Sequence, residues 1–164
     1  MTVYLYHDPH LAEPRFGVCS RNLDLLETEG NSFWNKAREL DFESKLKSLG
    51  RNLAFQMELY GSGINGNWEG IPEHKVAVFD IWDIDTQSYL GSEERRDIVA
   101  KLGLDHVPVI AVRQFDFETM ADALEFAKGP SLHNKIREGL VWKATDGSYN
   151  FKTINNDFLV KQKD

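Results

Sequence analysis

The sequence predicts an α+β fold in which antiparallel sheets are flanked by helices. Seven runs read as strands and three as helices. Most neighbouring strands are joined by turn residues and not by helices, which favours antiparallel pairing over a doubly wound parallel sheet. One pair of strands is separated by an Asp-Gly turn, which is typical of an antiparallel hairpin.

The first half of the chain combines four strands with one long helix. Trp34, Ala37 and Leu40 begin a run of apolar residues at near-helical spacing, and Gly50 follows as a helix-ending residue. Prolines and glycines bound the strand-like runs. The predicted elements are strands at Met1–Tyr6, Phe16–Ser20, Leu53–Tyr60 and Lys75–Ile84, and a helix at Trp34–Leu49.

The second half contains two shorter helices, a buried strand and the hairpin. Ser92 begins a helical stretch that ends before Gly103. The turn Thr145-Asp146-Gly147 predicts a type I′ geometry, since Asp-Gly favours positive φ angles. The predicted elements are helices at Ser92–Leu102 and Phe117–Phe126, a strand at Val107–Val112, and hairpin strands at Gly139–Ala144 and Tyr149–Ile154.

The composition fits one domain with a core of its own. The 164 residues are 41% hydrophobic, and a chain of this size buries about two-thirds of its unfolded surface. The single cysteine, Cys19, excludes an internal disulfide and a multi-cysteine metal site, and fits a reducing cytoplasm. No apolar run approaches the ~20 residues that cross a bilayer, so no membrane partner is expected. The net charge of −7 confines any polynucleotide contact to a local basic patch.

Three charged residues in the hairpin form the first candidate site. Glu138 opens one strand, Lys143 lies near its end, and Lys152 lies on the other strand. A carboxylate can hold a divalent metal and lysines can hold phosphates, so the set suits a nucleoside triphosphate. The odd step from Glu138 to Lys143 puts their side chains on opposite faces of a regular strand, which argues against direct pairing. Solvated edge charges are the alternative.

The strand Lys75–Ile84 carries the second candidate, Phe79 and Asp80. Strand alternation puts these two side chains on opposite faces. Burial of Asp80 among apolar neighbours is costly unless a cation or hydrogen bonds accompany it. An aromatic ring beside a structured acid suits stacking of adenine. An ordinary core strand is one alternative, and a metal-dependent phosphoester hydrolase built on Asp80, Asp83 and Asp85 is another.

Two further strings carry binding candidates. Glu58 precedes Gly61-Ser62-Gly63, and glycines after a strand let the backbone approach a ligand closely. Arg21 follows a predicted strand and can form a bidentate contact with a phosphate or a carboxylate. A plain loop and a structural salt bridge are the respective alternatives.

Taken in order, these strings resemble the motifs of the covalent nucleotidyltransferase superfamily, and most closely those of the ATP-dependent RNA ligases. Each match alone is weak, but five in the expected order are specific and span most of the chain. The matching strings are Phe16-Gly17-Val18-Cys19-Ser20-Arg21-Asn22, Glu58-Leu59-Tyr60-Gly61-Ser62-Gly63-Ile64, Phe79-Asp80-Ile81-Trp82-Asp83-Ile84-Asp85, Glu138-Gly139-Leu140-Val141-Trp142-Lys143 and Phe151-Lys152.

The resemblance implies an adenylation domain that binds ATP with Mg²⁺, or with Mn²⁺ in its place. The motif of Phe79 and Asp80 supplies the ring that stacks on adenine, and Glu58 contacts the ribose. The cations that contact the phosphates are Arg21, Lys143 and Lys152. The carboxylate that is associated with the metal is Glu138. The full-length enzyme is expected to form lysyl-AMP, pass AMP to an RNA 5′-phosphate and seal that end to a 3′-hydroxyl.

One departure from the family pattern bears on activity. The nucleophile of the family is the lysine of a Lys-x-Asp-Gly string, and no such string occurs in the 164 residues. We therefore expect residues 1–164 to form a single partial adenylation domain, truncated at its N-terminal side and without a C-terminal accessory domain. Such a chain is expected to be inactive alone. A non-catalytic nucleotide-binding or interaction module is the alternative.

Overall fold

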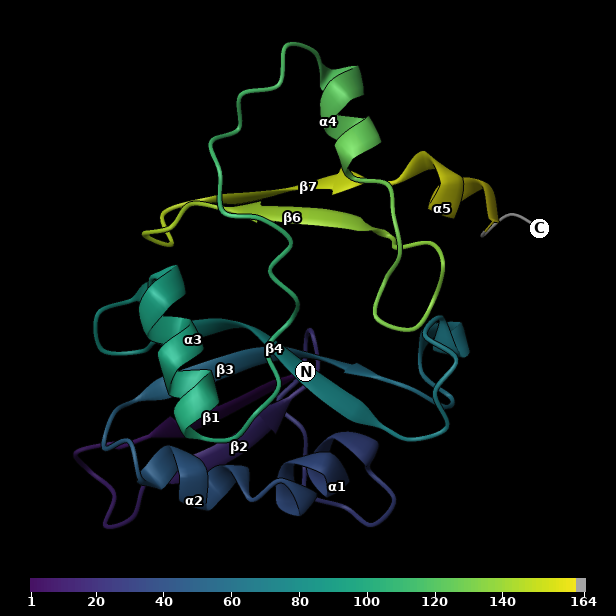
Figure 1. The fold of residues 1–164 in the computed structure, drawn as a ribbon. Coiled ribbons are helices and arrows are strands. Elements are labelled where there is room, and N and C mark those ends of the chain that lie inside the picture. The colour runs from purple at the N-terminus through teal and green to yellow at the C-terminus, as the bar shows by residue number, and fades with distance from the viewer. Residues whose placement is uncertain (162–164) are drawn as a thin grey trace.

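The computed structural model describes residues 1–161 and contains two antiparallel sheets (Figure 1). The large sheet has the strand order β2-β1-β3-β4-β5, and the hairpin sheet pairs β6 with β7. The predicted α+β class with antiparallel sheets is confirmed. The strands span Thr2–Tyr6 (β1), Arg15–Cys19 (β2), Leu53–Tyr60 (β3), Lys75–Asp83 (β4), Ser88–Tyr89 (β5), Gly139–Lys143 (β6) and Asn150–Ile154 (β7).

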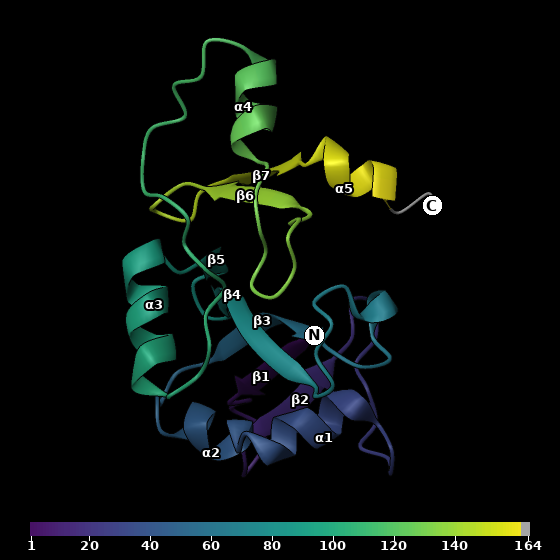
Figure 2. The same ribbon diagram turned by 45° about the vertical axis from the view of Figure 1, so that its right-hand side comes forward.

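The helices divide between the two sheets. Helices α1 and α2 cover one face of the large sheet, α3 lies beside β4, and α4 and α5 accompany the hairpin sheet (Figures 1 and 2). Within residues 1–161, no helix is long and apolar enough to cross a membrane. The helices span Ser32–Glu39 (α1), Phe42–Lys47 (α2), Ser92–Lys101 (α3), Met120–Phe126 (α4) and Asn156–Lys161 (α5), with a 3₁₀ turn at Asn65–Asn67 (η1).

The main core lies between the large sheet and helices α1 and α2. Alternate residues of β3 point into it, and Leu53, Phe55 and Met57 are fully buried. Phe42 and Leu46 of α2 meet them from the helical side. Because this layer fills one face of the sheet, the other face is left for the hairpin sheet.

The predicted long helix at Trp34–Leu49 is wrong, because the chain breaks into α1 and α2. Asp41, between them, has a left-handed conformation with a φ of 51°, which aspartate tolerates better than most residues. The break turns α2 so that Phe42 and Leu46 are buried as fully as Ala37 of α1. Apolar spacing cannot locate such a break, since both helices face the same core.

The predicted buried strand at Val107–Val112 is also wrong. The segment is irregular, and Val109, Ile110 and Val112 are 49%, 51% and 72% exposed. Its pairing with the large sheet is confined to a parallel bridge between His106 and Val78. Residues 107–112 then leave β4 and run toward the hairpin sheet (Figure 1). Pro108 contributes to the end of the pairing, because it has no N–H to donate.

Two local predictions need correction. The helix predicted from Phe117 begins at Met120, because Thr119 and Asp122 form a capping box. The hairpin turn is not type I′, since Thr145 and Asp146 both keep negative φ angles. Only Gly147 has a positive φ, of 80°, and its N–H donates to the carbonyl of Ala144.

The hairpin sheet lies over the face of the large sheet that α1 and α2 leave uncovered (Figure 2). The indole of Trp68 joins the two layers: it donates to the carbonyl of Ile136 at 2.9 Å, and its ring meets Phe158 edge-on. At the other end, the N–H of Ser92 donates to the carbonyl of Thr145 at 2.8 Å. The two sheets are therefore held face to face at both ends.

Candidate functional site

A β-bulge in β4 puts Phe79 and Asp80 on the same side of the large sheet. The pairing of β3 with β4 shifts at this point, because Gln56 faces Asp80 while the next residue, Met57, faces Val78. Phe79 is the extra residue. Both side chains approach the same ammonium group: Lys143 Nζ lies 5.3 Å from the Phe79 ring centroid and 2.6 Å from Asp80 Oδ2. The predicted alternation, which separated Phe79 from Asp80, is therefore wrong.

Asp80 is buried, and two cations hold its carboxylate. Its side chain is 9% exposed, and it receives Lys143 Nζ at 2.6 Å on one oxygen and Arg95 Nη1 at 3.3 Å on the other. This bears out the expectation that a buried Asp80 is accompanied by a cation or by hydrogen bonds. The ion pairs span β4, β6 and α3, so they also fasten the hairpin sheet to the large sheet.

Lys143 is tied to β4 by a second contact. Its Nζ donates to the carbonyl of Phe79 at 2.8 Å in addition to Asp80. Burial lowers the pKa of Lys143, and the hydrogen bond to Asp80 and the charge of that carboxylate act in the opposite direction. The ammonium group thus lies beside the Phe79 ring, to which the resemblance assigns stacking on adenine.

The register of the hairpin puts its two lysines on one face and its two aromatic rings on the other. Lys152 pairs with Val141 and lies on the same face as Lys143, which turns toward the large sheet. The opposite face carries Trp142 and Phe151, whose rings stack at 6.2 Å. These two rings belong to an aromatic cluster with residues near α4, namely Phe115, Phe117 and Phe126. Both predicted lysines of the hairpin therefore share the face that looks onto Asp80.

Glu138 pairs with Lys152 and not with Lys143. Glu138 precedes the first residue of β6, and its carboxylate accepts from Lys152 Nζ across the end of the hairpin. The two side chains are 53% and 42% exposed, and an ion pair so open to solvent is weak. The pair can therefore exchange its partners for a ligand at little cost.

Glu58 and Arg21 are exposed and stand apart from these two groups. Glu58 lies on the open face of β3, opposite Ala77 of β4. Arg21 follows the end of β2. Within residues 1–161 neither side chain has an ion pair or a hydrogen bond, so the salt bridge considered for Arg21 is not formed there. The structure leaves both side chains available to a ligand.

In the loop Gly61-Ser62-Gly63 after Glu58, the first glycine allows two backbone segments to pack closely. Gly61 has a φ of 127°, and a Cβ there would lie 2.0 Å from the carbonyl oxygen of Glu73. Gly63 has a φ of 76°, with open space around its Cβ position. The need for Gly61 therefore comes from a close approach of two backbone segments.

The three aspartates of the hydrolase alternative are not gathered at one place. Asp83 accepts from Arg51 at 2.8 Å and from the backbone of Asp85 and Thr86, on the core side of β4. Asp80 is on the opposite side with its own cations. Across residues 1–161, no group of three His, Cys, Asp or Glu side chains is placed to hold a metal ion. The metal cluster that this alternative needs is absent from that part of the chain.

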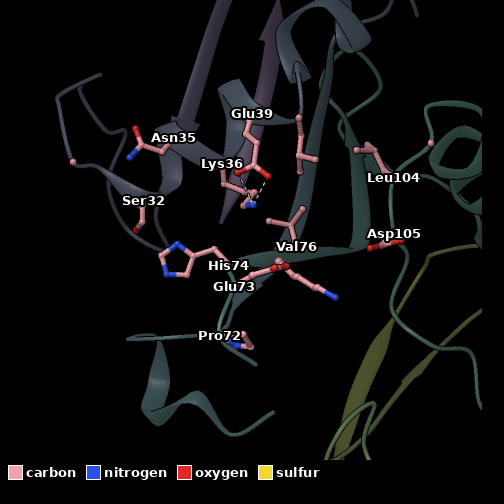
Figure 3. A pocket seen from close by; sticks show the side chains of 14 residues that line it. Ser32, Asn35, Lys36, Glu39, Pro72, Glu73, His74, Val76, Leu104 and Asp105 are labelled. Carbon is pink, nitrogen blue, oxygen red and sulfur yellow. Dashed lines mark hydrogen bonds and ion pairs between the residues drawn. The ribbon is translucent and has the colours of Figure 1, made fainter. Parts of the chain in front are cut away.

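Two cavities of the structure lie apart from the residues of the candidate site. One of about 650 Å³ opens between α1, the start of β4 with the loop before it, and the loop at 103–105, where Lys36 pairs with Glu39 near His74 (Figure 3). Another, of about 550 Å³, lies at the start of α3. Neither includes Glu58, Phe79 or Lys152 among its lining residues. The candidate site is accordingly identified from the charged groups between the two sheets.

Arg95 and His106 join the site without having been predicted. Arg95 Nε donates to His106 Nε2 at 3.2 Å while Nη1 holds Asp80. The sequence offered one signal: Arg95 precedes the buried Val99 by four positions in α3, so it falls on the apolar stripe of that helix. A charged residue on such a stripe indicates a buried partner.

The comparisons with known proteins identify the family. The sequence model of the RNA ligase family matches residues 1–163, and no curated protein sequence matches the chain. A mutant of Naegleria gruberi RNA ligase with AMP and Mn is 38% identical at a TM-score of 0.89, covering 99% of this chain and 49% of that one.

Other forms of the same Naegleria gruberi enzyme agree. A mutant with ATP and Mn is also 38% identical, with a TM-score of 0.90, and covers 99% of this chain and 49% of that one. A form with PPi gives a TM-score of 0.89. This chain spans about half the length of these solved relatives. On the family match over the whole described fold, the chain belongs to the RNA ligase family.

Proposed function

We propose that residues 1–164 are the nucleotide-binding part of one adenylation domain, whose full-length form is an ATP-dependent RNA ligase. One observation carries the proposal: the hairpin turns Lys143 and Lys152 toward the sheet face that bears Phe79 and Asp80. Cations thus meet an aromatic ring across two layers, as a nucleotide with a flat base and charged phosphates requires. The AMP, ATP and PPi of the solved Naegleria gruberi forms support this choice of ligand.

In this proposal the base and the ribose bind on the large sheet. Phe79 stacks on adenine from the bulge of β4, and Asp80 keeps Lys143 beside the ring. Glu58, exposed on β3, accepts hydrogen bonds from the ribose hydroxyls. The bulge matters here because it turns the ring toward the ligand while Val78 and Ile81 on either side stay in the core.

The phosphates are assigned to the cations. Lys152 leaves Glu138 for the α-phosphate, and Arg21 approaches from the end of β2. Asp80 and the Phe79 carbonyl hold the ammonium group of Lys143 beside the Phe79 ring. In this proposal Lys143 therefore lies between the part of the site that binds the base and the part that binds the phosphates. In the full-length enzyme these cations would offset the charge that develops when the α–β bond breaks and pyrophosphate leaves.

Glu138 is the proposed ligand of Mg²⁺, or of Mn²⁺ in its place. The chemistry of the donor set fits, since Mg²⁺ is commonly held by one or two carboxylates together with substrate phosphates and waters. Glu138 is half exposed and lies beside Lys152, so one carboxylate and the phosphates would share the ion. The metal would offset phosphate charge there.

The partners of the full-length protein are proposed to be ATP, AMP and RNA ends, and its location the cytoplasm. AMP would pass from a lysine to an RNA 5′-phosphate, and attack by a 3′-hydroxyl would then seal the ends and release AMP. The single cysteine supports a reducing compartment. A non-catalytic nucleotide-binding module is the second candidate, favoured by the lack of a Lys-x-Asp-Gly string in these 164 residues.

Calorimetry with AMP tests the site through Lys152. Lys152→Ala is expected to abolish measurable AMP binding, a loss of about tenfold or more for one charge-assisted phosphate contact. Lys128→Ala is the matched control, because Lys128 is similarly exposed and also pairs with a glutamate, Glu125. Equal AMP affinity in the wild-type chain and in Lys152→Ala would contradict the assignment.

A further inference from the structure

A buried chain of polar contacts runs from His106 to the candidate site. Its first link is the bond from Arg95 Nε to His106 Nε2, and its second is the ion pair of Arg95 with Asp80. The third is the contact of Asp80 with Lys143, whose Nζ also meets the Phe79 carbonyl. The Arg95 side chain is 6% exposed, so water cannot replace its partners.

The contacts of His106 determine which ring nitrogen carries its proton. Arg95 Nε–H is a donor, so the Nε2 atom it meets must be an unprotonated acceptor. Nδ1 lies 2.6 Å from the carbonyl of Val107, and a carbonyl only accepts, so Nδ1 carries the hydrogen. His106 is therefore neutral, in the Nδ1–H form.

The backbone fixes the ring in place. Val78 N–H donates to the carbonyl of Asp105 at 2.8 Å, and Val107 N–H donates to the carbonyl of Val78 at 2.9 Å. These two bonds flank His106 and attach it to Val78 of β4, the residue directly before the bulge at Phe79. Arg95 thus has a partner of fixed position on the side away from Asp80.

We propose that Arg95 and His106 are positioning residues of the nucleotide site. Neutral His106 orients Arg95, Arg95 and Lys143 together orient Asp80, and the resulting arrangement holds Lys143 beside Phe79. Neither residue touches the ligand in this scheme. The binding role rests on the proposed function, whereas the coupling of His106 to Lys143 can be measured without any ligand.

Protonation of His106 breaks the first link. An imidazolium has two donors, so its Nε2–H would face the Nε–H of Arg95 and the hydrogen bond would be lost. The charged groups around His106 oppose that proton: Arg95 and Arg96 of α3 and Lys143 of β6 are all cationic, while Asp80 of β4 is already bound to Arg95 and Lys143. Burial and these cations lower the pKa of His106 from 6.5.

Labelled nitrogen signals of the free chain test the coupling. The expected result is the neutral Nδ1–H form of His106 at pH 7, titration below pH 6.5, and a Lys143 Nζ signal that shifts along the same titration curve. An Nε2–H form, or a Lys143 signal unaffected by the titration of His106, would overturn the proposal.

AMP calorimetry at pH 7.5 and pH 5.5 tests the binding role. His106→Gln keeps an oxygen that can accept from Arg95 but cannot titrate. We expect AMP affinity to fall about tenfold more in the wild-type chain than in His106→Gln, the equivalent of one hydrogen bond to a charged group. The phosphate of AMP also titrates between these pH values, but it does so equally with the wild-type chain and with His106→Gln, so its effect cancels in the comparison of the two proteins. His74→Gln is the control, because the His74 ring bonds to the carbonyl of Ser62 and not to Arg95, Asp80 or Lys143, and it should retain the wild-type pH dependence.

Arg95→Lys supplies a second variant. A lysine keeps a cation for Asp80 but cannot donate to Asp80 and His106 in the fixed geometry of a guanidinium. We expect Arg95→Lys to bind AMP with the weak pH dependence of His106→Gln, and wild-type pH dependence in both variants would overturn the proposal. No AMP binding at any pH would overturn the proposed function and the binding role with it. The nitrogen signals would still support or overturn the coupling.

Discussion

At the scale of single residues, Asp80 controls both the site and the contact between the layers. It is the meeting point of Arg95 and Lys143, each itself largely buried. A buried ion pair of this kind adds little net stability compared with apolar packing, but removal of one partner leaves a charge without compensation. The Asp80 carboxylate is therefore more important for keeping the two cations in place than as an independent source of stability.

Asp80→Asn is expected to lower the free energy of unfolding by about 3 kcal/mol, because Lys143 and Arg95 would remain close together without their shared anion. Urea denaturation measures the change. Asp97→Asn is the matched control, since Asp97 lies on the exposed side of the neighbouring α3, and its effect should stay within ~0.5 kcal/mol. Similar losses in the two variants would count against a clamped Asp80.

The stability of the chain should depend on pH through His106. Its pKa is lowered in the folded state relative to 6.5, so the unfolded chain takes up the proton first as the pH falls. The contribution is fully present above pH 6.5 and is lost as the pH falls through the lowered folded-state pKa, by about 1.4 kcal/mol per pH unit at most.

Urea denaturation at pH 7.5 and pH 5 measures this effect. The wild-type chain should lose more stability between the two values than His106→Gln does, and His74→Gln should behave like the wild type. If His106→Gln lost as much stability between pH 7.5 and pH 5 as the wild type does, the pH dependence would come from other groups.

At the scale of elements, tight connections determine where the strands can run. The loop after β3 passes so close to the segment before β4 that only a glycine fits at Gly61, and Asp41 supports the sharp turn between α1 and α2. Both residues act through backbone conformation. Gly61 lets the end of β3 pass close to the segment before β4, and Asp41 lets α2 pack against the core face of the large sheet.

Gly61→Ala should be more harmful than Gly63→Ala, although both glycines have positive φ angles. At Gly61 the added Cβ would collide with the Glu73 carbonyl, whereas the space around Gly63 is open. We expect Gly63→Ala to cost ~1 kcal/mol of stability through backbone strain alone, and Gly61→Ala to cost at least ~2 kcal/mol more. Thermal unfolding of the two variants measures the difference. Equal shifts in Tm for Gly61→Ala and Gly63→Ala would contradict the role of Gly61.

At the scale of the whole molecule, two sheets face each other and divide the work of ligand binding. The large sheet brings an aromatic ring and a buried carboxylate, and the hairpin sheet brings Lys143 and the exposed pair of Lys152 and Glu138. The Phe79 ring and the two lysines of the candidate site therefore come from different sheets. A ligand that touches both would add to the contacts that already join them at Trp68, Ser92 and Lys143.

The chain is expected not to adenylate itself, because no Lys-x-Asp-Gly lysine stands ready to attack the α-phosphate. Incubation with Mg²⁺ and ATP labelled at the α-phosphate measures this. Calorimetry with AMP serves as the control, since binding without an adduct shows that the pocket is formed but the nucleophile is missing. A covalent AMP adduct on this chain would show that another lysine can act.

Much of this arrangement could be predicted from sequence, because strand runs, turn residues and ordered motifs are local signals. The α+β class, the hairpin and the separation of Glu138 from Lys143 followed from such signals. The break at Asp41 and the loss of pairing after His106 did not, because tertiary packing decides them. The roles assigned to Glu58, Arg21 and Lys152 stay predictions. Arg95 was detectable as a charge on an apolar stripe, but its partner His106 lies eleven positions away in an irregular segment.

The bulge at Phe79 resets the phase of β4. Before it, even-numbered residues such as Val76 and Val78 face the core, and after it the odd-numbered Ile81 does. The strand is thus two half-strands spliced by one surplus residue. Deletion of Phe79 alone would leave both halves paired with β3 as they are now, because Val78 already faces Met57 and Asp80 already faces Gln56, so a uniform pleat would result. The surplus residue therefore leaves the pairing of β4 unchanged and adds one side chain, next to Asp80, to the face that bears the candidate site.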